Sequence, residues 1–235
     1  NLDQKSALAG MASDFLLSKK LSSVVITDVD GQVIARGEDS ERIGDALSGN
    51  GLVKRSLLGE SASSVTTRDG VVAPDVLISA SVPIMDKEEV VGVVLGNILI
   101  DNAFVDGVNK ATGLASSIYG DDKISATTLL AEDSITRRIG VAETNEKIKE
   151  TVLGKGEGFT GTTNLLNTPY FVSYLPLKDI DSTPIGMLFV GKPEVSVLAT
   201  AGRSIKASFV VDGILWLLAI LPSYLIASYI SRLLK

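Results

Sequence analysis

The sequence predicts an α+β fold made of two modules, each an antiparallel sheet flanked by helices. The first observation is a repeated pattern of an apolar run, a Pro, a short acidic break and a second apolar run around a Gly. It occurs as "VLISASVPIMDKEEVVGVVLGNI" (residues 76–98) and as "YFVSYLPLKDIDSTPIGMLFVGKP" (residues 170–193). The second observation is the shortness of the breaks, which cannot hold a parallel crossover and therefore favour antiparallel pairing. Two copies are too few for a solenoid, so we interpret them as two small domains.

The first module is expected to start with a helix over residues 2–21, where Leu8, Met11 and Phe15 recur at helical spacing. The next segment, "SSVVITDVDGQVIARG", predicts a hairpin, because Asp30-Gly31 is a tight-turn signal between two apolar runs. Short helices are then expected at "DSERIGDAL" and "GLVKRSLLG". Strands are expected at "SSVTTRDGVV", at residues 76–83 and at residues 90–99.

The second half repeats this order more loosely. "GLASSIYGDDKISATTL" indicates strand, polar turn and strand, and "DSITRRIG" and "NEKIKETVLGKG" are expected to be helical. "GFTGTTNLLNTPYFVSYLPL" and "TPIGMLFVGKP" supply the closing strands, and a helix is expected to follow Pro193. The G-x-G-x-x-G match at residues 156–161 follows a helix and enters a strand, the reverse of a dinucleotide fold, so we interpret it as turn glycine.

The end of the chain predicts a transmembrane helix. Residues 213–230 carry no charge and are apolar on all faces, and their length is near that needed to cross a bilayer. Arg232 and Lys235 follow directly and place that end in the cytoplasm, so everything before Val210 is expected outside. The alternative is a buried core helix. Because the chain starts with Asn1 rather than Met, a preceding segment is also expected.

Composition excludes several classes of function. The net charge is −6 and no basic stripe with interleaved aromatics occurs, so no nucleic-acid partner is expected. The absence of Cys and His removes thiolate and imidazole metal sites, Cys nucleophiles and His-based triads. "DVDG" at residues 28–31 starts like a calcium loop, but the later Gly and Glu spacing fails. We therefore expect no metal and no cofactor.

The order of these motifs resembles the extracytoplasmic double Cache domains of bacterial receptors, whose modules are PAS-like. "VVITDVDGQVIAR", "ERIGDAL", "LLGESASSVTTRDG" and "SASVPIMDKEEVVGVVLGNI" are similar to the Cache type of citrate and dicarboxylate sensor kinases. "ISATTL", "VLGKGEGFTG", "YFVSYLPLKD" and "PIGMLFVGKP" are similar to the type found in many chemoreceptors. The implied domains are an N-terminal signalling helix (1–21), a membrane-distal module (22–105), a membrane-proximal module (106–193), a connecting helix (194–209), a transmembrane helix (210–231) and the start of a HAMP-like linker (232–235).

The resemblance implies a sensor rather than an enzyme. It implies a homodimer in the bacterial inner membrane, with residues 1–209 extracytoplasmic. A small organic acid or amino acid would bind over one sheet and move the membrane helix, which passes the signal to a kinase, chemotaxis or cyclase module. Two alternatives stay open. One is an ectodomain with a structural or protein-partner role and no small ligand, and the other is a membrane-tethered hydrolase using a Ser-Lys pair or paired carboxylates.

Arg68 is the first candidate for binding the ligand. In citrate sensors, the strand similar to "SSVTTRDG" carries an Arg that contacts a ligand carboxylate, and a guanidinium matches a carboxylate with two parallel hydrogen bonds. The alternative is an exposed Arg beside a turn. Thr66 and Thr67 would add hydroxyl donors, and as strand neighbours at most one of them shares the face of Arg68.

Five further residues are candidates, each with a structural alternative. Arg36 ends the first hairpin, where this sensor type places a basic residue, and its alternative is a solvated strand end. Ser79 and Ser81 share a strand face and leave room for a ligand, or else they pack against a helix. The citrate sensors carry basic residues on this strand and this chain does not. Tyr170 and Tyr174 share a face in the second module and would line a pocket there, or else they belong to the core.

Overall fold

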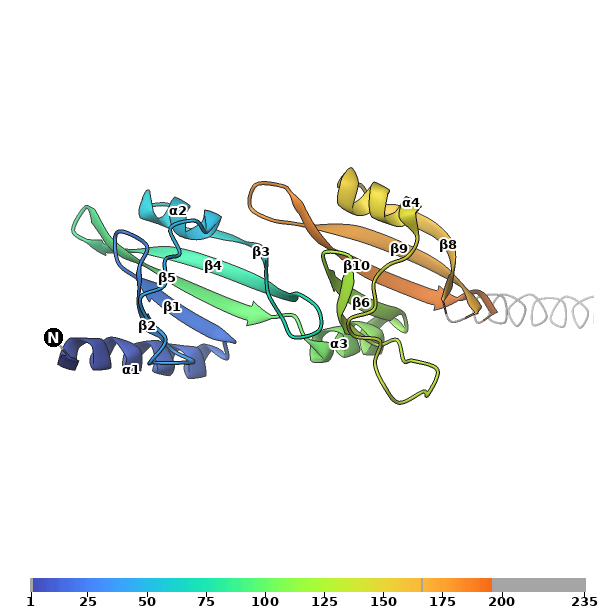
Figure 1. Cartoon of the computed structure of the whole chain (residues 1–235), viewed down its shortest axis with the longest axis horizontal. Helices are drawn as coiled ribbons and strands as arrows, with labels where there is room; N and C mark the ends of the chain where they lie inside the picture. The colour runs from blue at the N-terminus through green and yellow to red at the C-terminus, as the bar shows by residue number, and fades with distance from the viewer. Residues whose placement is uncertain (1, 166, 196–235) are drawn as a thin grey trace, which may run out of the picture. The chain divides into compact units, whose positions relative to one another are not determined.

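Two five-stranded sheets with the same strand order form the fold, as the repeated pattern predicts (Figure 1). The computed structural model describes residues 2–165 and 167–195. The strand orders are β2-β1-β5-β4-β3 and β7-β6-β10-β9-β8, and the sheets are antiparallel. In each sheet the first strand of the module pairs with the last one, β1 with β5 and β6 with β10. The first and last strands of each module are therefore neighbours. The expected α+β class is confirmed.

The first module places one helix on each face of its sheet. Ala12 of α1 packs against Val24 and Ile26, while Leu52 and Val53 of α2 pack on the opposite face. The Asn50 side chain caps α2 by accepting from the Leu52 and Val53 amides at 2.9 and 3.2 Å. The elements are α1 (Leu2–Lys19), β1 (Ser23–Thr27), β2 (Val33–Arg36), α2 (Gly51–Leu57), β3 (Ala62–Arg68), β4 (Asp75–Asp86) and β5 (Glu89–Leu99).

The second module follows the same plan. Ile148 of α4 and Val152 of the π-helical turn η1 are fully buried, as α2 residues are in the first module. The elements are α3 (Asn102–Thr112), β6 (Ala115–Gly120), β7 (Lys123–Thr127), α4 (Glu146–Lys149), η1 (Glu150–Gly154), β8 (Phe159–Leu165), β9 (Thr168–Lys178) and β10 (Pro184–Pro193).

Two segments expected to be helices are loops. In residues 39–47, Gly44 has φ of +91° and donates its amide to Val33 of β2, so this segment lies along the hairpin. In residues 133–140, Ser134 and Gly140 have φ of +57° and +82°, and the Thr136 carbonyl accepts from the Ala131 amide at 2.7 Å. Backbone in the left-handed region interrupts a right-handed helix, so this segment is a loop.

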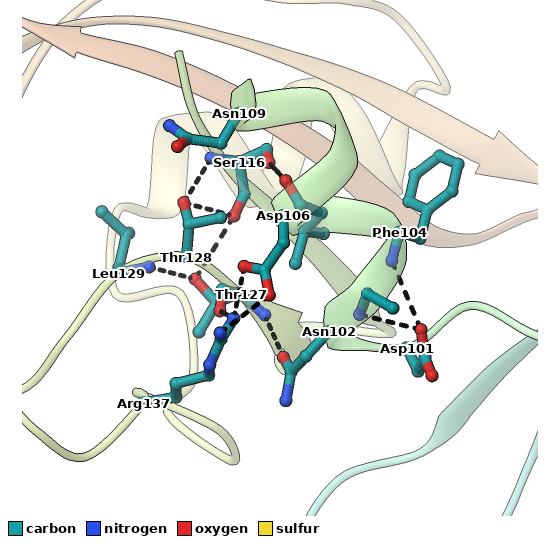
Figure 2. Close-up of polar contacts among 12 residues, drawn as sticks. Asp101, Asn102, Phe104, Asp106, Asn109, Ser116, Thr127, Thr128, Leu129 and Arg137 are labelled. Atoms are coloured by element: carbon teal, nitrogen blue, oxygen red, sulfur yellow. Dashed lines mark hydrogen bonds and ion pairs between the residues drawn. The ribbon is translucent and has the colours of Figure 1, made fainter. Parts of the chain in front are cut away.

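Helix α3 was not predicted, and the domain boundary expected after residue 105 falls inside it. Asp101 caps its start, and Gly113 in the left-handed region ends it. Arg137 links this helix to β7 (Figure 2). Its Nη1 and Nη2 donate to the two Asp106 carboxylate oxygens at 2.8 and 2.9 Å. Nη1 also donates to the Thr127 carbonyl of β7 at 2.7 Å. These bonds hold the pKa of Asp106 below its ordinary value.

Residues 1–162 and 172–191 form one compact unit, which contains the whole first sheet and most of the second. Within it, one core cluster combines Val76 and Ile100 with Val105, Ile118 and Ala126, so the modules share buried apolar surface. The other unit contains, among the described residues, the ends of β8, β9 and β10 and residues 194–195.

No helix among residues 2–165 and 167–195 is long and apolar enough to cross a membrane. The predicted transmembrane helix (210–231), the linker (232–235) and most of the predicted connecting helix (194–209) lie outside the described residues.

We expect Leu52→Ala to lower the free energy of unfolding by about 2–5 kcal/mol, because it removes a fully buried side chain from the core under α2. The control is Leu58→Ala at the end of the same helix, where the side chain is 81% exposed and the change should stay within about 0.5 kcal/mol. Urea unfolding followed by circular dichroism measures both. Equal losses in the two variants would contradict the assigned core.

Candidate functional site

A pocket of about 410 Å³ lies over the face of the first sheet that also carries α2. Its floor consists of strand residues, and one wall is the loop between β2 and α2. A volume in this range holds a small metabolite. The floor and rim are Ser23, Val25, Arg36, Thr66, Thr67, Arg68, Leu77, Ser79, Leu95 and Asn97, and the loop wall is Glu38, Asp39, Arg42, Asp45, Leu47 and Asn50.

Four polar side chains cross the floor as a continuous row. The hydroxyls of Thr66 and Ser79 lie 2.6 Å apart, Ser79 donates to Asn97 Oδ1 at 2.6 Å, and Asn97 Nδ2 donates to Ser23 at 2.8 Å. The register produces this row, because Ser79 lies opposite Asn97 and Asn97 lies opposite Ser23. We call these four residues the polar row. It satisfies polar groups on a buried surface and leaves them able to bond a ligand.

The two predicted serines have different roles. Ser79 belongs to the polar row and lines the pocket. Ser81 donates to the Leu52 carbonyl at 2.9 Å and lies 2.7 Å from the Ser56 hydroxyl, so it holds α2 on β4. Ser81 is 1% exposed and lies outside the set of residues that line the pocket. The helix-packing alternative therefore describes its contacts.

Arg36 lines the pocket, but its donors are already engaged. Nε donates to the Arg42 carbonyl at 2.9 Å, Nη2 forms an ion pair with Asp45 Oδ2, and Nη1 lies 3.7 Å from Glu38. Its side chain is only 11% exposed. Arg36 thus holds the loop wall against β2, and it supports the pocket by fixing the positions of Arg42 and Asp45.

Two other guanidiniums face the pocket and remain accessible to a ligand. Arg68 is 49% exposed and contacts Asp75. Arg42 is exposed and forms no ion pair within the described part of the chain. The buried Oδ1 atom of Asp45 has no hydrogen-bond donor among the described residues. The pocket therefore offers guanidinium donors to a ligand.

The register assigns the two threonines to opposite faces of β3. Thr66 pairs with Leu77 and Arg68 with Asp75, so Thr66 shares the face of Arg68. Thr67 pairs with Val76, which belongs to the core cluster on the other face, although Thr67 also borders the pocket at this edge strand. Thr66 and Thr67 were both predicted from the sequence, whereas Ser23, Asn97, Arg42 and Asp45 were not. Their positions depend on strand pairing and loop path, which no local motif signals.

Aromatic side chains fill the corresponding face of the second sheet. Aligned on the Pro of each pattern, Tyr174 stands where β4 carries Ser81. The Tyr174 side chain is fully buried, its ring centroid lies 5.1 Å from that of Phe189 and 6.1 Å from that of Tyr119, and its hydroxyl donates to Glu143 at 2.8 Å. Tyr170 is half-buried on the same strand. Neither tyrosine lines the pocket, and the contacts of Tyr174 are those of its core alternative.

Burial raises the pKa of both Tyr119 and Tyr174 well above the ordinary value of 10.0, and the charge of Glu143 adds to the effect. No group of three or more metal-binding side chains occurs among the described residues.

Residues 96–203 match the family model described as "Single cache domain 3". No curated protein matches the sequence. Among solved structures, the chain is similar to the sensor domain of the histidine kinase DctB from V. cholerae, with 11% identity, a TM-score of 0.53 and coverage of 83% of this chain and 80% of that chain. It is also similar to the periplasmic domain of RsbU from Chlamydia trachomatis, with 15% identity, a TM-score of 0.50 and coverage of 83% and 78%. At these identities the likeness shows that the chain has the fold of Cache-type sensor domains.

Tyr174→Phe is expected to cost about 1–3 kcal/mol of unfolding free energy, because it removes a hydrogen bond to a charged group and leaves Glu143 Oε2 without this donor at a partly buried position. Tyr170→Phe removes the same atom from a half-buried residue of the same strand and should change stability by less than about 0.5 kcal/mol. Urea unfolding of both variants measures the difference, and a neutral Tyr174→Phe would contradict the bond to Glu143.

The raised pKa values also predict a loss of stability at alkaline pH. Above pH 10.0 the unfolded chain releases protons from Tyr119 and Tyr174 that the folded chain retains, so the free energy of unfolding falls as pH rises further. Unfolding measured on either side of this pH checks the sign. Ultraviolet titration should show that Tyr119 and Tyr174 stay protonated in the folded chain above pH 10.0. Ionisation of these two residues near pH 10.0 without unfolding would contradict their burial.

Proposed function

We propose that this chain is the extracytoplasmic ligand-sensing region of a bacterial transmembrane receptor, and that it binds a small carboxylate-bearing metabolite in the pocket of the first sheet. The observation that carries the proposal is the pocket itself, which combines the polar row with two accessible guanidiniums. A guanidinium beside neutral hydroxyl and amide groups is suited to binding a carboxylate together with its polar substituents.

The charges of the pocket favour an amino acid over a polycarboxylate such as citrate. Three guanidiniums line it, but so do the carboxylates of Glu38, Asp39 and Asp45. A ligand with several negative charges would be repelled by these carboxylates, whereas a ligand ammonium group would be attracted to them. Both organic acids and amino acids therefore belong in a ligand screen, and we expect the stronger response from the amino acids.

The sensor fold supports the remaining parts of the proposal. The two modules would form a double Cache pair, the chain would act as a homodimer, and residues 210–231 would anchor it in the inner membrane with residues 1–209 outside. Ligand binding would then shift the equilibrium between two arrangements of the strands and pass a small displacement to the membrane helix. No catalytic role is proposed for this region.

A thermal-shift screen of the full chain against organic acids, amino acids and amines tests the proposal. A ligand at about 100 times its Kd should add roughly 2.7 kcal/mol of stability. Arg68→Ala should abolish the shift. The matched control is Arg55→Ala, because Arg55 is 45% exposed, pairs with Asp181 and lies outside the pocket lining, so the shift should persist in that variant.

A screen in which no compound changes the melting temperature would contradict small-ligand sensing and favour the protein-partner alternative. A ligand-induced rise in melting temperature that persists in Arg68→Ala would show that the ligand does not bind in the first-sheet pocket.

A further inference from the structure

Arg68, the proposed ligand-binding residue at the rim of the pocket, already forms an ion pair within the chain. Arg68 ends β3 and Asp75 begins β4, and the two residues lie directly opposite each other in the sheet. Both Nε and Nη2 of Arg68 lie 3.0 Å from the same oxygen, Asp75 Oδ2. The side chains are 49% and 33% exposed. An intramolecular carboxylate therefore stands where a ligand carboxylate would bind.

The residues on either side of Asp75 are held by the second sheet. The carbonyl of Pro74 accepts a hydrogen bond from the Ser125 hydroxyl of β7, and the same hydroxyl oxygen accepts from the Gly120 amide at 3.0 Å. Pro74 lies so close to Gly120 that a Cβ there would meet its carbonyl oxygen at 2.6 Å. On the other side, Val76 is fully buried in the core cluster with Ile118. Asp75 thus sits between two residues fixed to β6 and β7.

We propose that Asp75 is a tethered competitor that occupies Arg68 when the pocket is empty, and that its displacement by a ligand carboxylate is transmitted through Pro74 to the β6–β7 hairpin. This inference rests on the proposed function, since it adds a means of regulation to the same pocket. The exchange replaces the Asp75 carboxylate with that of the ligand, and Asp75, whose side chain is 33% exposed, is accessible to water once released. A ligand that replaces Asp75 interacts differently with the two states, which is the requirement for shifting their populations.

The consequence of breaking the pair is a weaker anchor for Pro74. Without its contact to Arg68, residues 74–76 are attached to the first sheet by fewer interactions, and the Ser125–Pro74 and Gly120–Ser125 hydrogen bonds open more often. Amides of residues 118–126 should then exchange hydrogen faster, because exchange reports local opening. Variants that break the pair should produce this effect without any ligand.

The experiment is a double-mutant cycle on the full chain in mild detergent, measured by hydrogen–deuterium exchange and mass spectrometry. Asp75→Asn and Arg68→Gln should each accelerate exchange of residues 118–126 by about two- to fivefold, as expected for loss of an exposed pair. The double variant should be no faster than the faster single one, because the two side chains act as one pair. Asp181→Asn is the control, since it removes an exposed carboxylate from the Arg55 pair and should leave residues 118–126 unchanged.

Unchanged exchange in either single variant, or additive effects in the double variant, would overturn the inference. Titration with succinate and with glutamate separates it from the proposed function, and Asp75→Asn should bind whichever of these probes binds the wild type several-fold tighter. If a carboxylate binds but the two variants have additive effects on exchange, the ligand pocket is supported and the role of Asp75 as a competitor is contradicted. If the effects are coupled but no carboxylate of the screen binds, the Arg68–Asp75 link to the second sheet is supported and the proposed ligand class is contradicted.

Discussion

The hydrogen bond between Ser79 and Asn97 allows the first sheet to keep a pocket over one of its faces. It joins two strands at the centre of the sheet, and the bonds to Thr66 and Ser23 extend it across four strands. Polar side chains that satisfy one another need no apolar layer above them, so a cavity over this face costs little. In the second sheet the equivalent face carries Val172, Met187 and Phe189, all buried, and an empty space over such residues would forfeit their contacts. The same topology therefore yields a pocket in one module and a filled core in the other.

The strands were predictable because their signal is local. Each closing hairpin carries apolar runs, a Pro and an acidic turn within about 25 residues, and the structure follows this pattern in both halves. Helix α3 was not predicted although Asp101 and Gly113 are cap residues, and the module boundary expected after residue 105 falls inside it. Residues 39–47 and 133–140 were expected to be helical. Gly44, Ser134 and Gly140 have positive φ, which interrupts a right-handed helix and favours loops instead.

The candidate site was predictable only where one residue type suggests one chemistry. Arg36, Arg68, Thr67 and Ser79 were selected from the sequence, and the structure gathers all four around one pocket. Asn97 and Ser23 have no distinguishing motif, and their place in the polar row follows from the register of β5 with β1 and β4. Asp45 and Arg42 belong to a loop whose path depends on pairing beside β2. Tyr174 shows the converse case, since a pair of tyrosines on one strand face is equally compatible with a pocket and with a core.

Arg36 and Arg68, two of the three arginines that line the pocket, differ in a way that assigns them different roles. Arg36 is 11% exposed and its charge is balanced by Asp45 and Glu38, so removing a partner would leave a charge uncompensated in a poorly hydrated position. Such a pair is not readily exchanged and suits a residue that holds a loop in place. Arg68 is 49% exposed, and water can replace either member of its pair with Asp75 at small cost. A contact that is cheap to exchange contributes little to stability, but it can respond to a ligand. Because Pro74 and Val76 tie Asp75 to the second sheet, that response need not end at the pocket.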